Sequence, residues 1–199
     1  MSSTPQNRYK ADLREFRFLM FEQFGLGELL GKAPYDAWGR DEIDMVLEES
    51  YKFACEVTGP LNAVGDREGC RIEGGRVKTP TGFADAWDKL REAGWKALAV
   101  DPEYDGQGAP KMLWCAVEEF LCGSNPAFNM YPGLAHGAGE VIEHFGTARQ
   151  KKLFVHALFH GKWGGTMCLT EPQAGSDVGA ARTAAKRLGD GRYEITGTK

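Results

Sequence analysis

The sequence has no excess of positive charge and no long run of apolar residues. Among its 199 residues, 28 are acidic and 24 are basic, so the net charge is −4. A broad basic surface for nucleic acid is therefore not expected, and no apolar stretch is long enough to span a bilayer. The first ten residues, MSSTPQNRYK, lack the apolar centre of a secretory signal. These absences predict a cytoplasmic protein without nucleic-acid or membrane partners.

The sequence also lacks the cysteine spacings of zinc and redox sites. It has five cysteines, but no C-x-x-C pair and no accompanying histidine at a zinc-binding spacing. We expect the cysteines to be small buried residues, with Cys115 and Cys122 on the buried face of one helix. His156 and His160 are four residues apart, as in half of a metal site, but no third ligand accompanies them. No metal site is predicted, and we expect both histidines in solvent or at the edge of the core.

Apolar residues recur at helical spacing through most of the chain. Three stripes, at 13–24, 43–54 and 83–93, predict helices, and we expect the second to stop at Gly59-Pro60. Apolar residues at helical spacing occur again at 113–121. These patterns predict a helical domain that extends to residue 161.

Two further features mark the end of this helical region. The segment NPAFNMYPGLAHGAGEVIEHFG predicts a helix that is broken at Pro132-Gly133, because proline removes a helical hydrogen bond. Thr147 and Gln150 have the spacing of a capping box, which predicts a helix that continues through LFVHALFHG.

At Gly161 the apolar period changes from 3.6 to 2. KWGGTMCLT is short and compatible with a strand, and TAAKRLGDGRYEITGTK predicts two strands around Gly189-Asp190-Gly191. One strand and one hairpin are marginal alone, because such a sheet leaves its edges and one face unburied. We therefore predict an α+β chain, with an all-helical N-terminal domain followed by the start of an antiparallel β domain. We also expect the sequence to be the N-terminal part of a longer protein.

A motif lies where the helical region gives way to strands, and it resembles a known signature. CLTEPQAGSDVGAARTAA followed by YEITGTK, together with the upstream DPEYDGQG, resembles the flavin-binding signature of the acyl-CoA dehydrogenase family. YKADLREFRFLMFEQFG, NMYPGLAHG and KWGGTMCLTEP are similar to the branch that includes the 3-methylmercaptopropionyl-CoA dehydrogenases. The resemblance implies a truncated acyl-CoA dehydrogenase fold, with a helical extension at 1–35, the family's N-terminal helical domain at 36–161 and the start of the middle β domain at 162–199.

The resemblance implies FAD as the cofactor and assigns roles to five residues of the motif. Met167, Leu169 and Thr170 would lie along the isoalloxazine ring, where they offer backbone groups and a hydroxyl. Gly175 and Ser176 would meet the phosphate side of the flavin, and Ser176 would also touch the CoA thioester. Glycine suits such a position because it lets the backbone approach a bulky ligand closely.

The resemblance also implies a reaction, namely flavin-dependent oxidation of an acyl-CoA to the 2,3-enoyl-CoA. Met130, Tyr131 and Gly133 would form the floor of the pocket for the acyl tail. The family's catalytic base is a glutamate of a C-terminal helical domain, so no catalytic residue is expected in this chain. Glu171 is expected to make a structural hydrogen bond or salt bridge, not to serve as that base.

Two residues of the motif have local interpretations. Pro172 has no amide hydrogen and should turn the chain out of a strand. Gln173 stands where many family members have glycine, and its side chain is expected to point to solvent.

The resemblance further implies electron-transferring flavoprotein as the electron acceptor and a homodimer or homotetramer as the assembly. Two alternatives remain open at this point. The chain could be a non-catalytic binding or assembly module that keeps the fold, or a flavin oxidase or monooxygenase built on the same fold.

Overall fold

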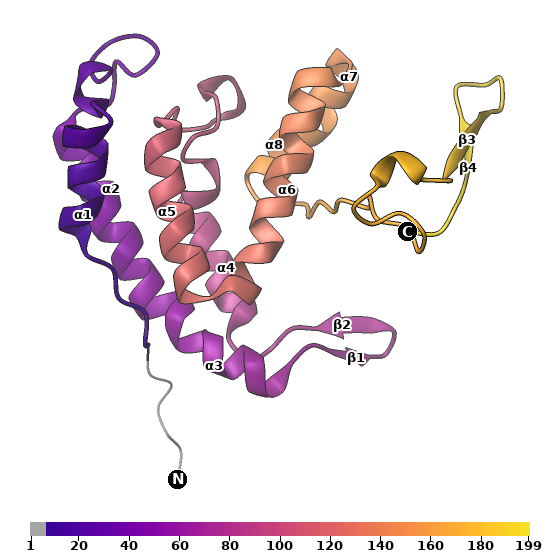
Figure 1. Cartoon of the computed structure of the whole chain (residues 1–199), viewed down its shortest axis with the longest axis horizontal. Coiled ribbons are helices and arrows are strands. Elements are labelled where there is room, and N and C mark those ends of the chain that lie inside the picture. Colours follow the sequence, from indigo (N-terminus) through magenta and orange to yellow (C-terminus); the bar gives the residue numbers. More distant parts are fainter. Residues whose placement is uncertain (1–6) are drawn as a thin grey trace. The chain divides into compact units, whose positions relative to one another are not determined.

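The computed structural model describes residues 7–199, which fall into two units. One unit ends at Gly165 and contains the α-helices, whereas the other, Thr166–Lys199, contains a short hairpin (Figure 1). This order confirms the predicted α+β class, with helices first and an antiparallel β segment after them. The three-part division of the chain stays a prediction, and residues 1–6 of its first part lie outside the described residues. Within 7–199, no helix has both the length and the apolar character that crossing a bilayer requires.

Within residues 7–165, the helical unit has eight α-helices, short 3₁₀ and π-helical turns, and one hairpin. The α-helices are α1 (Leu13–Arg17), α2 (Arg40–Phe53), α3 (Gly59–Glu68), α4 (Phe83–Glu92), α5 (Lys111–Ser124), α6 (Pro126–Phe145), α7 (Ala148–Gln150) and α8 (His156–Phe159). The π-helical turns are η1 (Phe18–Gln23), η3 (Ala54–Thr58) and η6 (Lys151–Val155), and the 3₁₀ turns are η2 (Leu26–Glu28), η4 (Trp95–Ala97) and η5 (Pro102–Tyr104).

Side chains cap the starts of several helices. The Asp12 carboxylate accepts a hydrogen bond from the second amide of α1, and the Asn125 side-chain oxygen accepts one from the Phe128 amide in α6. At α7 the Thr147 hydroxyl and the Gln150 side chain each accept from the other residue's amide, which confirms the predicted capping box. Each such cap stabilises a helix by about 1 kcal/mol, because it satisfies an amide that has no helical partner.

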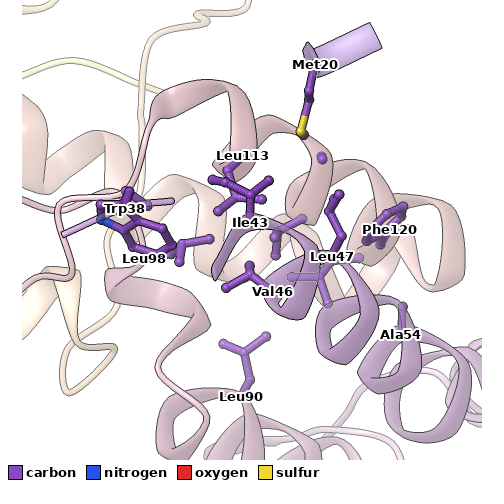
Figure 2. Packing of buried hydrophobic residues seen from close by; sticks show 14 of the residues in the cluster. Met20, Trp38, Ile43, Val46, Leu47, Ala54, Leu90, Leu98, Leu113 and Phe120 are labelled. Atoms are coloured by element: carbon purple, nitrogen blue, oxygen red, sulfur yellow. The ribbon is translucent and has the colours of Figure 1, made fainter. Parts of the chain in front are cut away.

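The core of the helical unit lies between α2 and α5. Figure 2 shows Ile43 and Leu47 of α2 in one cluster with Leu113 and Phe120 of α5. The Phe120 ring also meets the edge of the Phe16 ring, with 4.6 Å between the centroids. Each fully buried side chain of this size contributes about 1.5–3 kcal/mol through the hydrophobic effect. The stripes predicted at 43–54 and 113–121 therefore mark the core correctly, whereas Phe24, at the end of the first stripe, is 61% exposed.

The expected stop at Gly59-Pro60 is wrong. After α2 the chain continues through η3 directly into α3, and Pro60 lies in the first turn of α3. Proline fits there because its fixed φ is already helical. Gly59 fits because a Cβ would come within 2.8 Å of the Ala54 carbonyl oxygen.

The expected break at Pro132-Gly133 is also wrong. Helix α6 runs through Pro132 without interruption for 20 residues. Pro132 is buried, and the Lys96 ammonium group donates a hydrogen bond of 2.7 Å to its carbonyl. Proline inside a helix costs about 3 kcal/mol, so tertiary packing of both ends of α6 outweighs the local preference.

One hairpin of the helical unit was not predicted. Strands β1 (Arg71–Glu73) and β2 (Arg76–Lys78) pair antiparallel around Gly74 and Gly75, which both have positive φ (Figure 1). Two such glycines form the tight turn that a two-residue hairpin needs. The signal was present in the sequence RIEGGRVK, but both strands are exposed and so lack an apolar pattern.

The expectation of buried cysteines is wrong. Cys115 and Cys122 are exposed, and Cys55 is partly exposed. Cys115 and Cys122 share a face of α5, as their spacing requires. The buried face of α5 is a different one, which carries Leu113 and Phe120. A spacing of seven places residues on one face without saying which face packs on the core.

The second unit contains the predicted hairpin. Strands β3 (Ala184–Arg187) and β4 (Tyr193–Thr196) pair antiparallel, after the 3₁₀ turn η7 (Val178–Ala180). Gly189 and Gly191 both have positive φ in the connecting turn, which confirms the prediction. The strand expected in KWGGTMCLT is absent from the described residues, because no other segment there pairs with it.

Candidate functional site

The motif TEPQA forms a two-residue turn. The Glu171 amide donates to the Ala174 carbonyl and the Ala174 amide donates to the Glu171 carbonyl, each over 3.0 Å. Pro172 occupies the first central position of the turn, where a fixed φ is favourable and no amide is needed. The motif therefore turns the chain back on itself directly after Thr170, as the proline predicted.

Both oxygens of the Glu171 carboxylate accept hydrogen bonds. Oε1 accepts from the Thr183 amide at 3.0 Å and from the Lys199 ammonium group at 2.9 Å. Oε2 accepts from the Arg182 amide and from the Gln173 side chain, each at 2.7 Å. Hydrogen bonding from Thr183, the Arg182 amide and Lys199 holds the pKa of Glu171 well below its usual range. These contacts confirm the structural role expected for Glu171.

Gln173 is exposed, as expected, but its side chain also makes contacts within the second unit. Its side-chain amide folds back onto Glu171 and also lies 3.4 Å from the Ala180 carbonyl oxygen. The reason is electrostatic, because a buried carboxylate attracts any amide donor within reach. A glycine at this position could not supply that donor.

The five motif residues assigned to a cofactor are all exposed. Met167 is 71% and Leu169 is 49% accessible, and Thr170, Gly175 and Ser176 are exposed as well. No hydrogen bond within residues 7–199 engages the amides of Met167, Leu169 or Thr170. The segment thus presents free donors beside a hydroxyl, which is the chemistry that an anionic ring system requires.

Gly175 has open space around it in this chain. A Cβ there would meet no atom within 4 Å, and its φ lies outside the left-handed region. Backbone strain therefore does not explain the glycine, and the space around it is open.

The three residues assigned to the acyl pocket lie in α6. Met130 and Tyr131 are exposed, and a Cβ on Gly133 would meet no atom within 4 Å. The Tyr131 ring packs edge-on against Trp87, with 4.8 Å between centroids, so its position is fixed. Gly137, one turn further, is equally open. Together these positions give α6 an unobstructed face.

A buried polar cluster beneath this face was not predicted. Lys96 is buried and binds the Pro132 carbonyl, while the Glu118 carboxylate accepts from the Asn129 side chain at 2.8 Å. Burial lowers the pKa of Lys96 to about 8, against the opposing charge of Glu118. Burial likewise raises the pKa of Glu118. No local spacing could reveal the cluster, because its members come from three separate segments.

His136 is a buried titratable group of α6. Its ring stacks on Trp114 at 5.3 Å between centroids, and its Nε2 lies 3.5 Å from a Glu140 carboxylate oxygen. Burial lowers the pKa of His136 to about 4, although Glu140 opposes the shift. His136 and Glu140 line a hollow of about 320 Å³, which none of the three proposed acyl-pocket residues lines.

The remaining histidines and the upstream motif have structural roles. His156 and His160 stack on each other at 4.3 Å, and His160 also contacts the Tyr104 carbonyl oxygen. No group of three potential ligands that could hold a metal occurs among the described residues. In DPEYDGQG, Gly106 is required because a Cβ there would collide with the backbone of Val100. This loop therefore packs the helical unit together.

Comparison with known proteins places these features in context. A model of the family described as acyl-CoA dehydrogenase, N-terminal domain, matches residues 40–162. The chain is 36% identical over 191 residues to a 3-methylmercaptopropionyl-CoA dehydrogenase of Ruegeria pomeroyi, which covers 96% of this chain and 32% of that protein. It is also 36% identical over 195 residues to the broad-specificity linear acyl-CoA dehydrogenase FadE5 of Mycobacterium tuberculosis, with 97% and 32% covered.

A solved structure supports the same fold. An acyl-CoA dehydrogenase from Bacillus anthracis, complexed with FAD, matches with a TM-score of 0.62 and 24% identity, over 79% of this chain and 25% of that one. At this identity the likeness concerns the fold alone. The chain spans about a third of the length of the curated relatives that it matches, namely 32% of each of the two proteins above.

Proposed function

Because this chain belongs to the acyl-CoA dehydrogenase family, we propose that it is part of an FAD-dependent enzyme that oxidises an acyl-CoA thioester to the 2,3-enoyl-CoA. The observation that carries the proposal is the exposed motif segment with unpaired amides at Met167, Leu169 and Thr170. FAD, when bound, takes up the hydride that leaves the β carbon of the substrate. The residues of this chain bind and orient the reactants.

The motif residues fit the flavin on grounds of donor chemistry and space. The amides of Met167 and Leu169 and the Thr170 hydroxyl are proposed to bind the ring, where negative charge develops during the reaction. The open backbone at Gly175 leaves room for the phosphate side, and the exposed Ser176 hydroxyl is proposed to reach both the cofactor and the thioester.

The open face of α6 is proposed to line the acyl tail. Gly133 and Gly137 are four residues apart and carry no side chain that could block a tail, whereas Met130 and Leu134 add apolar surface beside them. Tyr131 is held by Trp87 and is proposed to bound the pocket at one end. Apolar side chains of this kind select substrates by length, because they fill the volume that a longer acyl tail would need.

The catalytic base is proposed to lie outside this chain. Glu171 is the one carboxylate of the motif segment's turn, but four donors occupy its two oxygens. A general base needs a free lone pair directed at the substrate and a pKa near the working pH. Glu171 has neither, so a residue elsewhere in the complete protein is proposed to remove the α proton.

The proposed partners follow from the family alone. Electron-transferring flavoprotein is proposed as the acceptor of the electrons, and the complete protein is proposed to assemble as a homodimer or homotetramer.

The test uses the full-length protein that carries this chain. It is expected to purify with bound FAD, and acyl-CoA should bleach the flavin absorbance under anaerobic conditions. Electron-transferring flavoprotein, not oxygen, should restore the absorbance rapidly. A colourless protein that takes up no FAD would contradict the proposal and favour a binding module. Rapid oxygen consumption with acyl-CoA would instead identify an oxidase.

A further inference from the structure

The second unit has almost no apolar interior. Among residues 166–199, only Glu171 and Ala174 are buried, and Glu171 is just 5% exposed. The strands β3 and β4 are exposed along their whole length. A hydrophobic core therefore cannot organise this segment, and a buried carboxylate with four donors occupies the place of a core.

The donors around Glu171 come from three parts of the unit. Gln173 belongs to the motif turn, the amides of Arg182 and Thr183 directly precede β3, and Lys199 follows β4. The carboxylate thus fixes both ends of the segment 171–183. Amide donors that converge on a charged acceptor are among the stronger protein hydrogen bonds.

Lys199 adds a second attachment. Its ammonium group donates to the Leu169 carbonyl at 2.9 Å as well as to Glu171 at 2.9 Å. The end of the hairpin is therefore tied to the Leu169 carbonyl and to the Glu171 side chain, and these two residues flank Thr170. We call the group of Glu171, Gln173, Lys199 and the amides of Arg182 and Thr183 the Glu171 clamp.

We propose that the Glu171 clamp positions the cofactor-binding segment, so that Glu171 and Lys199 act as positioning residues for Thr170 and the loop that carries Gly175 and Ser176. The proposal rests on the proposed function, because it assumes that this segment binds FAD. Its physical basis is preorganisation: a loop held before the cofactor arrives loses less conformational entropy on binding. The clamp itself touches no reacting atom.

The test measures FAD affinity in the full-length protein without acyl-CoA. Glu171→Gln keeps the shape of the side chain but removes its charge and directs an amide group at donors. Lys199→Met removes only the two ammonium contacts. Each variant should raise the Kd for FAD by about tenfold or more, as loss of a charged hydrogen bond predicts. Lys199→Arg, which can still donate to both acceptors, should restore most of the affinity.

A matched control lies in the same unit. Asp190 accepts from the Arg192 amide at 3.1 Å and from its guanidinium at 2.7 Å, in the β3–β4 turn away from the clamp contacts. Asp190→Asn should leave the FAD affinity unchanged.

Two results would overturn the clamp. These are an unchanged Kd for FAD in both clamp variants, or an equal loss of FAD affinity in Asp190→Asn. If Glu171→Gln fails to fold, Lys199→Met and Lys199→Arg still decide the question. A wild-type protein that binds FAD but is not reduced by acyl-CoA refutes the proposed reaction alone, since the affinity comparison does not need turnover.

Discussion

Thr170 offers the sharpest test at the scale of a single residue. Its hydroxyl is exposed and makes no hydrogen bond within the described residues, so Thr170→Val should leave the protein's stability nearly unchanged. If the hydroxyl binds the flavin ring, FAD affinity should fall by the worth of a hydrogen bond to a charged group, about 1.5–3 kcal/mol. Titration of the full-length apoprotein with FAD measures this change.

Thr166 provides the control, because it is an exposed threonine of the same segment. Thr166→Val should bind FAD as the wild type does. Equal affinities in both variants would remove Thr170 from the site.

His136 predicts a dependence of stability on pH. Its folded-state pKa of about 4 lies below the ordinary value of 6.5, because burial disfavours the charged ring. The unfolded chain therefore binds the proton first as the pH falls. The contribution of neutral His136 to the free energy of unfolding is complete above about pH 6.5. This contribution falls by up to about 3 kcal/mol as the pH falls towards 4.

Denaturant unfolding at a series of pH values measures the slope of the unfolding free energy against pH. His136→Gln should flatten it between these two pH values. His144→Gln, at an exposed position of the same helix, should keep the wild-type slope. A slope that survives in His136→Gln would assign the effect to other groups.

At the scale of one element, α6 combines an open face with a buried anchor. The open positions at Gly133 and Gly137 lie on one side, and Lys96 holds the Pro132 carbonyl on the other. The anchor helps to explain how a helix containing proline keeps its shape. It also separates the two effects of a substitution at Gly133, since added side-chain atoms meet solvent-facing space and not the core.

Gly133→Leu should shift the preferred acyl-CoA towards shorter chains. A Leu side chain would occupy the space proposed for the tail, with discrimination of about 1–3 kcal/mol per methylene at most. Stability should not fall, because replacing glycine inside a helix gains about 0.5–1 kcal/mol. Values of kcat/KM across a series of acyl-CoA lengths measure the shift.

Gly133→Ala serves as the graded control and should give a smaller shift in the same direction. An unchanged length profile in both variants would mean that α6 does not line the acyl pocket. Loss of FAD would mean that the glycine matters for the backbone.

At the scale of the whole molecule, the two units differ in what stabilises them. The helical unit has a contiguous apolar core, whereas the second unit has exposed strands around one carboxylate. Such segments open locally at a small fraction of the global unfolding free energy. The second unit is therefore proposed to depend on contacts with further parts of the complete protein.

Amide hydrogen exchange of the 199-residue polypeptide should reveal this difference. The amides of α2 and α5 should exchange slowly, and those of β3 and β4 should exchange close to the rate of an unfolded chain. In the full-length protein with FAD, the β3 and β4 amides should become protected. Slow exchange of β3 and β4 in the polypeptide alone would show that the clamp suffices to stabilise them.

The sequence by itself determined the change from helices to a hairpin, the apolar stripes and the family. Hydrophobic period, helix caps and turn glycines act over a few residues, so the stripes on α2 and α5, the capping box at Thr147 and the hairpin at Gly189 could be predicted. The motif of the candidate site was predicted for the same reason, since its residues are contiguous.

Only the tertiary structure decided which faces are buried and what holds the motif. Cys115 and Cys122 point outward because α5 packs through its other face, and Pro132 stays helical because packing outweighs a local cost. Lys199 and Glu171 are 28 positions apart in the chain, and Lys96 and Pro132 are 36 apart. Contacts between residues so far apart leave no periodic trace in a sequence, because they depend on how the intervening elements fold.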